Sequence, residues 1–128
     1  MAAPEEVNGS VNEARIKSLI ADYVEAMTRG DEKLLAATFH PRAMSVGTLD
    51  GTFEWQTVSD LAAGFAEAAQ DGPPETPPHR IEQLFLTPTT AMAIVTTIWG
   101  GRSFTDILTF AKADGRWWIV QNLFHQPG

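Results

Sequence analysis

The sequence predicts an α+β fold, in which a curved antiparallel sheet wraps around N-terminal helices to form a cone with an internal pocket. Two observations lead to this expectation. Apolar residues recur at helical spacing early in the chain, whereas the later part alternates as strands do and is divided by glycine turns. Helices that precede a long run of strands are typical of an α+β domain.

Length, charge and cysteine content limit the function classes. The 128 residues carry a net charge of −7 and include no cysteine. We expect a flexible N-terminal tail over residues 1–9 and a single domain over residues 10–128. The acidic balance argues against nucleic acid and anionic membranes as partners, because both attract basic surfaces. The sequence shows no signal peptide and no membrane span, which favours a cytoplasmic location.

The first helix is expected over residues 11–29. Ser10 and Glu13 have the spacing of a capping box, in which each side chain bonds the other residue's backbone N–H. Gly30 suits the position just after the end of a helix. The apolar residues in between recur every three or four positions, so this helix should bury one face.

Two shorter helices should follow. Asp31 can cap a helix that runs to about Phe39, and Pro41 stops it. Thr57 and Asp60 suggest another cap, followed by a helix over residues 58–69.

The remaining segments read as strands and turns. Asp50-Gly51 is a strong hairpin signal within the strand pair 43–55, and the proline-rich stretch 71–78 reads as a connecting loop. A long meander then follows. Its four strands are expected at residues 80–87, 91–99, 103–112 and 116–125.

One strand contains a residue that strands disfavour. Residues 104–110 read FTDILTF, and Asp106 is the exception among apolar and β-branched neighbours. Alternation places Asp106 on one face with Phe104. A two-residue Gly-Gly turn pairs Asp106 with Val95 and puts Thr97 and Trp99 on the same face. That face is apolar apart from a few polar groups, which is the composition of a small-molecule pocket.

The register of the last hairpin has two readings. A three-residue loop with Gly115 in the left-handed position places Asn122 opposite Asp106, and we favour it. A two-residue loop would place Leu123 there instead, because a slip of one residue reverses every side chain. The favoured register adds Trp118, Val120 and Phe124 to the face of Asp106.

These alternations give a set of candidate pocket residues. Tyr23, the one tyrosine, could bond a ligand beside Asp106, or it could simply be a core residue. Asp106 itself could instead face solvent or serve structure only. The tryptophans could stack on a planar ligand or pack in the core, and His40 could act in catalysis or complement a helix end. The ligand-binding candidates are Trp99, Phe104, Trp118, Asn122, Phe124, Trp55 and His40.

The segments YVEAMTRGDEKLLAATFHPRA and FTDILTFAKADGRWWIVQNLFH resemble the nuclear transport factor 2-like superfamily. Within it, the chain looks closest to the small bacterial proteins described as "putative lumazine-binding". The resemblance spans nearly the whole length, and it implies the cone fold and pairing into dimers through the sheet. It does not by itself imply one chemistry, because this scaffold carries many.

The ketosteroid isomerases share this scaffold and offer a sharper comparison. In them an oxyanion hole is formed by a Tyr of the first helix and a protonated Asp of a strand. The Tyr precedes the Asp of a Gly-Asp pair by eight residues. Tyr23 stands eight residues before Asp31, and Asp106 matches the strand position. The isomerases also carry a general-base Asp on the first strand. The matching position here falls near Gly47, and Asp50 lies in the hairpin turn.

Two functions are compatible with this pattern. The first is an isomerase, lyase or cyclase that acts on a small apolar or carbonyl-bearing substrate, with Asp106 and Tyr23 as catalytic residues. The second is a non-catalytic binding module for a small aromatic ligand, and a structural dimeric accessory protein is a third possibility. No cofactor is expected, and no two histidines have metal-ligand spacing on one element. An apolar outer sheet face favours a homodimer.

Overall fold

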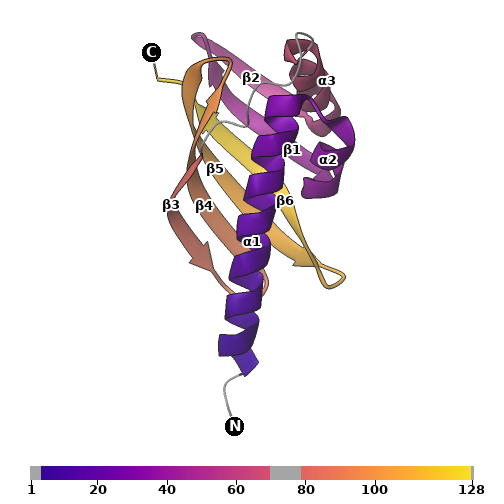
Figure 1. Cartoon of the computed structure of the whole chain (residues 1–128), viewed down its shortest axis with the longest axis vertical. Coiled ribbons are helices and arrows are strands. Elements are labelled where there is room, and N and C mark those ends of the chain that lie inside the picture. Colours follow the sequence, from indigo (N-terminus) through magenta and orange to yellow (C-terminus); the bar gives the residue numbers. More distant parts are fainter. Residues whose placement is uncertain (1–3, 70–78, 128) are drawn as a thin grey trace.

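The computed structural model describes residues 4–69 and 79–127, and it has the α+β architecture that the sequence predicts (Figure 1). The loop expected at 71–78 lies outside the described residues. The elements follow one another as α1 (Pro4–Arg29), α2 (Glu32–Thr38), β1 (Phe39–Leu49), β2 (Thr52–Thr57), α3 (Val58–Ala68), β3 (Arg80–Leu86), β4 (Thr90–Trp99), β5 (Arg102–Ala113) and β6 (Arg116–His125).

The helix α1 begins earlier than expected. It starts at Pro4, so Ser10 lies inside it and is not its N-cap. The reason lies in Pro4 of the sequence, because proline is favoured in the first turn of a helix. The residues expected to form a tail are therefore helical from Pro4 onward.

The six strands form one curved, unclosed sheet in the order β2-β1-β6-β5-β4-β3. Neighbours pair antiparallel except β1 and β6, which pair parallel. Helix α1 lies along the concave face of the sheet, and α2 and α3 stand beside one end of it (Figure 1). Ile16, Ile20 and Val24 of α1 are fully buried and belong to one core with the concave side of the sheet.

The cap predicted for α3 is confirmed. The Asp60 backbone N–H donates to Thr57 Oγ1, and the Thr57 backbone N–H donates to the Asp60 carboxylate, which is a complete capping box. This cap fixes where β2 ends and α3 begins. The helix then carries Leu61 and Phe65 to the open end of the concave sheet, where both are buried.

The last hairpin begins in the register of the two-residue loop, which was the alternative considered from the sequence, and it changes register farther from the turn. Asp114 and Gly115 form a two-residue turn, both with positive φ, and a bulge at Val120 then shifts the register by one residue. The bulge moves the partners in β6 by one residue, so Asp106 pairs with Phe124, and Asn122 pairs with Leu108 on the same face. The expectation of Asn122 opposite Asp106 is therefore wrong, although its expected face is right.

Before the bulge, the faces are reversed relative to the expectation. The favoured register puts Trp118 and Val120 on the face of Asp106, and therefore Trp117 and Ile119, which alternate with them, on the outer face. In the structure Trp117 and Ile119 are buried in the core, and Trp118 faces outward. The Trp117 indole N–H donates to Asn12 Oδ1 at 2.9 Å, so its polar group has a buried partner. Trp118 is thus removed from the face that carries Asp106.

Gly47 allows β1 and β6 to approach closely. A Cβ atom at this position would lie 2.0 Å from the Phe124 carbonyl oxygen and 2.7 Å from the ring of the same residue. Atoms cannot approach so closely, so any side chain would push the two strands apart. The glycine is therefore needed for the parallel β1–β6 pairing.

We predict that Gly47→Ala lowers the free energy of unfolding by about 1–3 kcal/mol, the usual cost of forcing an extra carbon into a packed site. Urea denaturation measures this. Gly9→Ala is the control, because a Cβ at Gly9 in α1 meets nothing within 4 Å. Equal stability of Gly47→Ala and the wild type would contradict the close approach.

Candidate functional site

Asp106 lies in the middle of β5, on the concave face of the sheet, and is 2% exposed. Its neighbours on that face of β5, Leu108 and Phe110, are buried as well. Strand alternation therefore carries a carboxyl group into the apolar interior, as the sequence suggested. Asp106 pairs with Val95 of β4, which confirms the expected Gly-Gly turn.

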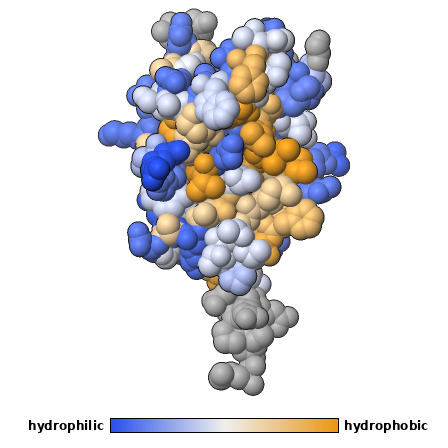
Figure 2. Space-filling model, turned by 180° about the vertical axis from the view of Figure 1, so that it is seen from behind, coloured by the Kyte–Doolittle hydropathy of each residue, from blue (hydrophilic) through white to orange (hydrophobic). Residues whose placement is uncertain are grey.

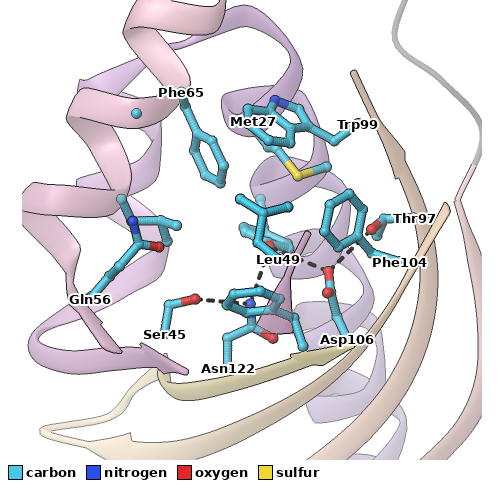
Figure 3. A pocket seen from close by; sticks show the side chains of 14 residues that line it. Met27, Ser45, Leu49, Gln56, Phe65, Thr97, Trp99, Phe104, Asp106 and Asn122 are labelled. Carbon is cyan, nitrogen blue, oxygen red and sulfur yellow. Dashed lines mark hydrogen bonds between the residues drawn. The ribbon is translucent and has the colours of Figure 1, made fainter. Parts of the chain in front are cut away.

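Two hydroxyl groups hold the Asp106 carboxyl group. Tyr23 donates its phenol O–H to Oδ2 at 3.3 Å, and Thr97 donates its hydroxyl to the same oxygen at 3.2 Å (Figure 3). Asn122 then donates its amide N–H groups to the Tyr23 oxygen at 3.4 Å and to Ser45 Oγ at 3.3 Å. We call these five residues the polar cluster. Both bonds to Asp106 use Oδ2, which leaves Oδ1 for a ligand.

The polar cluster is expensive to bury. All five side chains come from residues that are at most 2% exposed. The Asn122 oxygen Oδ1 has no hydrogen-bond partner among the described residues, and an unpaired buried acceptor costs about 1–3 kcal/mol. A core selected for stability alone would be apolar here, so the cluster indicates a function.

Burial raises the pKa of Asp106 from its ordinary 3.8 to about 7, although the hydrogen bonds from Thr97 and Tyr23 lower it. Near neutral pH the group can therefore either give or accept a proton. Burial also raises the pKa of Tyr23 well above its ordinary value, and the nearby Asp106 charge adds to this effect. The phenol consequently stays protonated and acts as a donor.

A cavity of about 170 Å³ opens beside the polar cluster. A cavity of about 150 Å³ holds benzene in another protein, so this space is large enough for at least one aromatic ring. The cluster forms a polar floor, and the other walls are mainly apolar (Figure 3). The lining residues are Tyr23, Met27, Ser45, Leu49, Gln56, Leu61, Gly64, Phe65, Thr97, Trp99, Phe104, Asp106, Asn122 and Phe124.

Four aromatic rings line one side of this cavity. The ring centroids of Phe65 and Trp99 lie 5.6 Å apart, those of Trp99 and Phe104 6.2 Å, and those of Phe104 and Phe124 6.2 Å. The ring planes meet at angles of 59–63°, so neighbouring rings pack edge to face and hold one another in place. Such a wall suits an aromatic ligand.

Six of the residues predicted from the sequence line the cavity together. They are Tyr23, Trp99, Phe104, Asp106, Asn122 and Phe124.

Three predicted residues lie elsewhere. Trp55 pairs with Val46 on the outer face and is 64% exposed. Trp118 faces outward because of the bulge, with the Arg116 guanidinium 3.7 Å above its ring. The ring of His40 contacts the edge of Trp118, and its Nδ1 accepts the Arg42 backbone N–H at 3.1 Å, so His40 has a local structural role.

Sequence reasoning missed the wall formed by β1, β2 and α3. The Asp50-Gly51 turn pairs Ser45 with Gln56, and both line the cavity. The turn signal could have given this pairing. Only the parallel β1–β6 contact, which joins distant segments, shows that the pair faces inward. Nothing in the sequence marked Gly64 as a cavity residue.

The structure explains why a first-strand carboxylate is missing. Gly47, where the isomerases would carry their base, lies against Phe124, and a side chain would collide with the ring and carbonyl of that residue. Asp50 sits in the exposed β1–β2 turn. Asp106 is therefore the single carboxyl group that lines the cavity among the described residues.

Two further findings concern the described residues 4–69 and 79–127. They contain no group of three or more His, Asp or Glu side chains placed to hold a metal ion. None of their helices is long and apolar enough to cross a membrane.

We predict a pH dependence of stability that belongs to Asp106. The folded protein keeps the proton of this group up to about pH 7, whereas the unfolded chain releases it near pH 3.8. Relative to Asp106→Asn, the wild type should therefore lose about 1.4 kcal/mol of unfolding free energy per pH unit between about pH 4 and 7. The difference should stay constant above pH 7. Urea denaturation of both proteins across this range measures it, and a flat difference would contradict a raised pKa.

Comparison with known proteins places the chain in a family. Residues 11–125 match the family described as putative lumazine-binding. An aldolase, FrzH, from a Cladobotryum species is 33% identical over 109 residues, which span 80% of this chain and 82% of that protein.

Two crystal structures are similar to it throughout. An NTF2-like protein of unknown function from Silicibacter pomeroyi is 30% identical with a TM-score of 0.86, covering 93% of this chain and 98% of that one. Another from Methylobacillus flagellatus is 25% identical with a TM-score of 0.80, covering 91% and 93%. The chain therefore belongs to the putative lumazine-binding family of the nuclear transport factor 2-like superfamily.

Proposed function

We propose that the protein is a lyase or isomerase of small carbonyl compounds, and that Asp106 moves a proton to or from the carbon next to the carbonyl group. One observation carries this proposal. A carboxyl group with a pKa of about 7 lines an apolar cavity, with one oxygen held by two donors and the other free. A group of this kind is suited to general acid–base catalysis near neutral pH.

The reaction begins with the ionised form of Asp106. Oδ1 takes a proton from the carbon next to the substrate carbonyl, the C–H electron pair becomes a carbon–carbon double bond, and the carbonyl oxygen takes up the negative charge. Returning the proton to another carbon completes an isomerisation. Attack of the enolate carbon on a second carbonyl forms a carbon–carbon bond and an alkoxide, and transfer of the proton from Asp106 to this alkoxide completes an aldol addition. The reverse sequence breaks that carbon–carbon bond.

Two further donors that line the cavity can stabilise the enolate oxygen. Ser45 Oγ accepts a hydrogen bond from Asn122, so its own hydrogen is available to a ligand. Gln56 lies beside it on the cavity wall and offers an amide N–H (Figure 3). Donors that face the developing charge are the usual means of lowering such a barrier.

Tyr23 can act in two ways. While Asp106 is ionised, the phenol holds Oδ2 and thereby directs Oδ1 to the cavity. When Asp106 is protonated, both groups can donate to a substrate oxygen, which is the oxyanion-hole arrangement that the sequence comparison with ketosteroid isomerases implies.

The aldolase name of the relative FrzH supports carbon–carbon bond chemistry at this site. No lysine lines the cavity among the described residues. A covalent Schiff base with the substrate is therefore not available there, and acid–base enolisation is the route that the lining residues offer. The second candidate is a non-catalytic binding module for a small aromatic ligand, which the aromatic wall favours.

Hydrogen exchange separates these two functions without knowledge of the natural substrate. In D₂O, we expect the wild type to exchange the methyl hydrogens of acetophenone, followed by proton NMR, with a rate that rises through about pH 7 as Asp106 ionises. Asp106→Asn should lower the enzymatic rate by at least about 100-fold, and Tyr23→Phe by less.

The matched control is Asp114→Asn, which removes a carboxylate from an exposed turn. Exchange should be unchanged in this variant. Binding of acetophenone without exchange would favour the binding module, and equal exchange by Asp106→Asn and the wild type would refute the proposed catalyst.

We also propose that two copies associate through the outer face of the sheet. Figure 2 shows hydrophobic residues gathered at the centre of this face. The pairing registers place five apolar side chains in one row across neighbouring strands: Trp55, Val46, Leu123, Ile107 and Ile94. The row carries no charge. Two chains with a net charge of −7 can therefore meet here without bringing like charges together.

Leu123→Glu should convert this dimer to a monomer, because the substitution places a charge at the centre of the row. Leu123 is 41% exposed, so the fold itself should tolerate the change. Analytical ultracentrifugation measures the mass. Glu67→Lys on the exposed side of α3 is the control and should remain dimeric. A monomeric wild type would refute the dimer.

A further inference from the structure

Gly64 is an unusual residue in α3. It lies inside the helix, which spans Val58–Ala68, and glycine is the poorest helix former after proline. Alanine residues surround it in this helix, so the local sequence otherwise favours helix strongly. Helix formation therefore does not account for a glycine at position 64.

Neither common reason for a glycine applies at this position. Gly64 is not among the glycines with positive φ, so its backbone does not require a missing side chain. It is also not needed for close packing, because a Cβ atom there would meet nothing within 4 Å. Gly30 and Gly47 differ clearly, since a Cβ at either would lie less than 3 Å from backbone atoms.

The open space beside Gly64 belongs to the cavity. Gly64 lines it together with Leu61 and Phe65, and because Leu61 precedes Gly64 by three residues and Phe65 by four, all three lie towards one side of the helix. Met27 and Trp99 line the same cavity, and Figure 3 shows them near Phe65, on the side away from the polar floor. The walls near Gly64 are therefore apolar, whereas Asp106 and its donors form the other end.

We propose that Gly64 is a specificity-determining residue, whose missing side chain leaves room for the apolar, planar tail of a substrate. This inference rests on the proposed function, and it adds the shape of the substrate. The carbonyl end lies at Asp106, and the tail extends past the aromatic wall towards α3. The substrate class is thus a carbonyl compound with an unsaturated or aromatic tail longer than one ring.

Two ketones that differ only in tail length test this proposal. Acetophenone has one ring, and 2-acetylnaphthalene carries a second fused ring in the direction of the tail. Calorimetry of the wild type should detect binding of both. Gly64→Leu should weaken binding of 2-acetylnaphthalene by about tenfold or more, the usual effect of a methylene-sized misfit in an apolar pocket, and Gly64→Ala by less. Binding of acetophenone should change by less than about twofold in both variants.

The Tm of each variant shows whether it is folded, so that a loss of binding is not mistaken for unfolding. Gly64→Ala should raise the Tm by about 2–4 °C, because alanine improves the helix and meets no neighbour. Gly9→Ala, also a helical glycine with nothing within 4 Å, is the matched control, and it should change neither affinity. A lower Tm for Gly64→Ala would make the glycine structural and overturn the inference.

The remaining outcomes separate the two proposals. If the wild type binds neither ketone, the proposed function falls, and this inference falls with it. If the wild type binds both and exchanges their methyl hydrogens, but Gly64→Leu binds 2-acetylnaphthalene as tightly as the wild type does, the inference about Gly64 alone is overturned. The inference would also be overturned if Gly64→Leu bound neither ketone while Gly64→Ala bound both as tightly as the wild type does.

Discussion

The desolvation of the Asp106 carboxyl group is the constraint around which the concave side of this protein is arranged. Burial raises the pKa of the group, and the hydroxyl groups of Tyr23 and Thr97 lower it by bonding Oδ2. Burial outweighs the two hydrogen bonds, so the pKa lies at about 7, above the ordinary 3.8. Because both donors use the same oxygen, the arrangement also decides which oxygen faces the cavity. The hydrogen bonds from Tyr23 and Thr97 thus both lower the pKa of Asp106 and orient its other oxygen towards the cavity.

Several features that lower stability converge on this one cavity. Asp106 is a buried titratable group, the Asn122 oxygen lacks a partner among the described residues, and Gly64 weakens helix α3 where it lines the cavity. Elsewhere the same chain follows local rules closely, as the complete capping box at Thr57 shows. Departures from local rules that gather in one place are expected of a functional site and not of a core that only holds the fold together.

The fold was predictable because its signals are local, whereas the exact site depends on contacts between distant segments. Alternation in FTDILTF and the Gly-Gly turn placed Asp106 opposite Val95, and the structure confirms this. The bulge at Val120 has no signal that propensity or turn chemistry could reveal, and it exchanges the faces of Trp117 and Trp118. The inward direction of Ser45 depends on the parallel pairing of β1 with β6, and no turn joins these strands.

A site with one carboxyl group has a consequence for the chemistry that it can perform. In the ketosteroid isomerase arrangement, one carboxylate moves the proton while a second, protonated one stabilises the oxygen. Here Asp106 occupies the place of the protonated carboxyl group, and the close contact between Gly47 and Phe124 removes the place for the proton-moving carboxylate. In the proposed reaction, Asp106 must therefore remove a proton and return it from the same oxygen, on one side of the substrate. Stabilisation of the enolate then falls to neutral donors such as Ser45 and Gln56, which can bind the oxygen while Asp106 changes its charge.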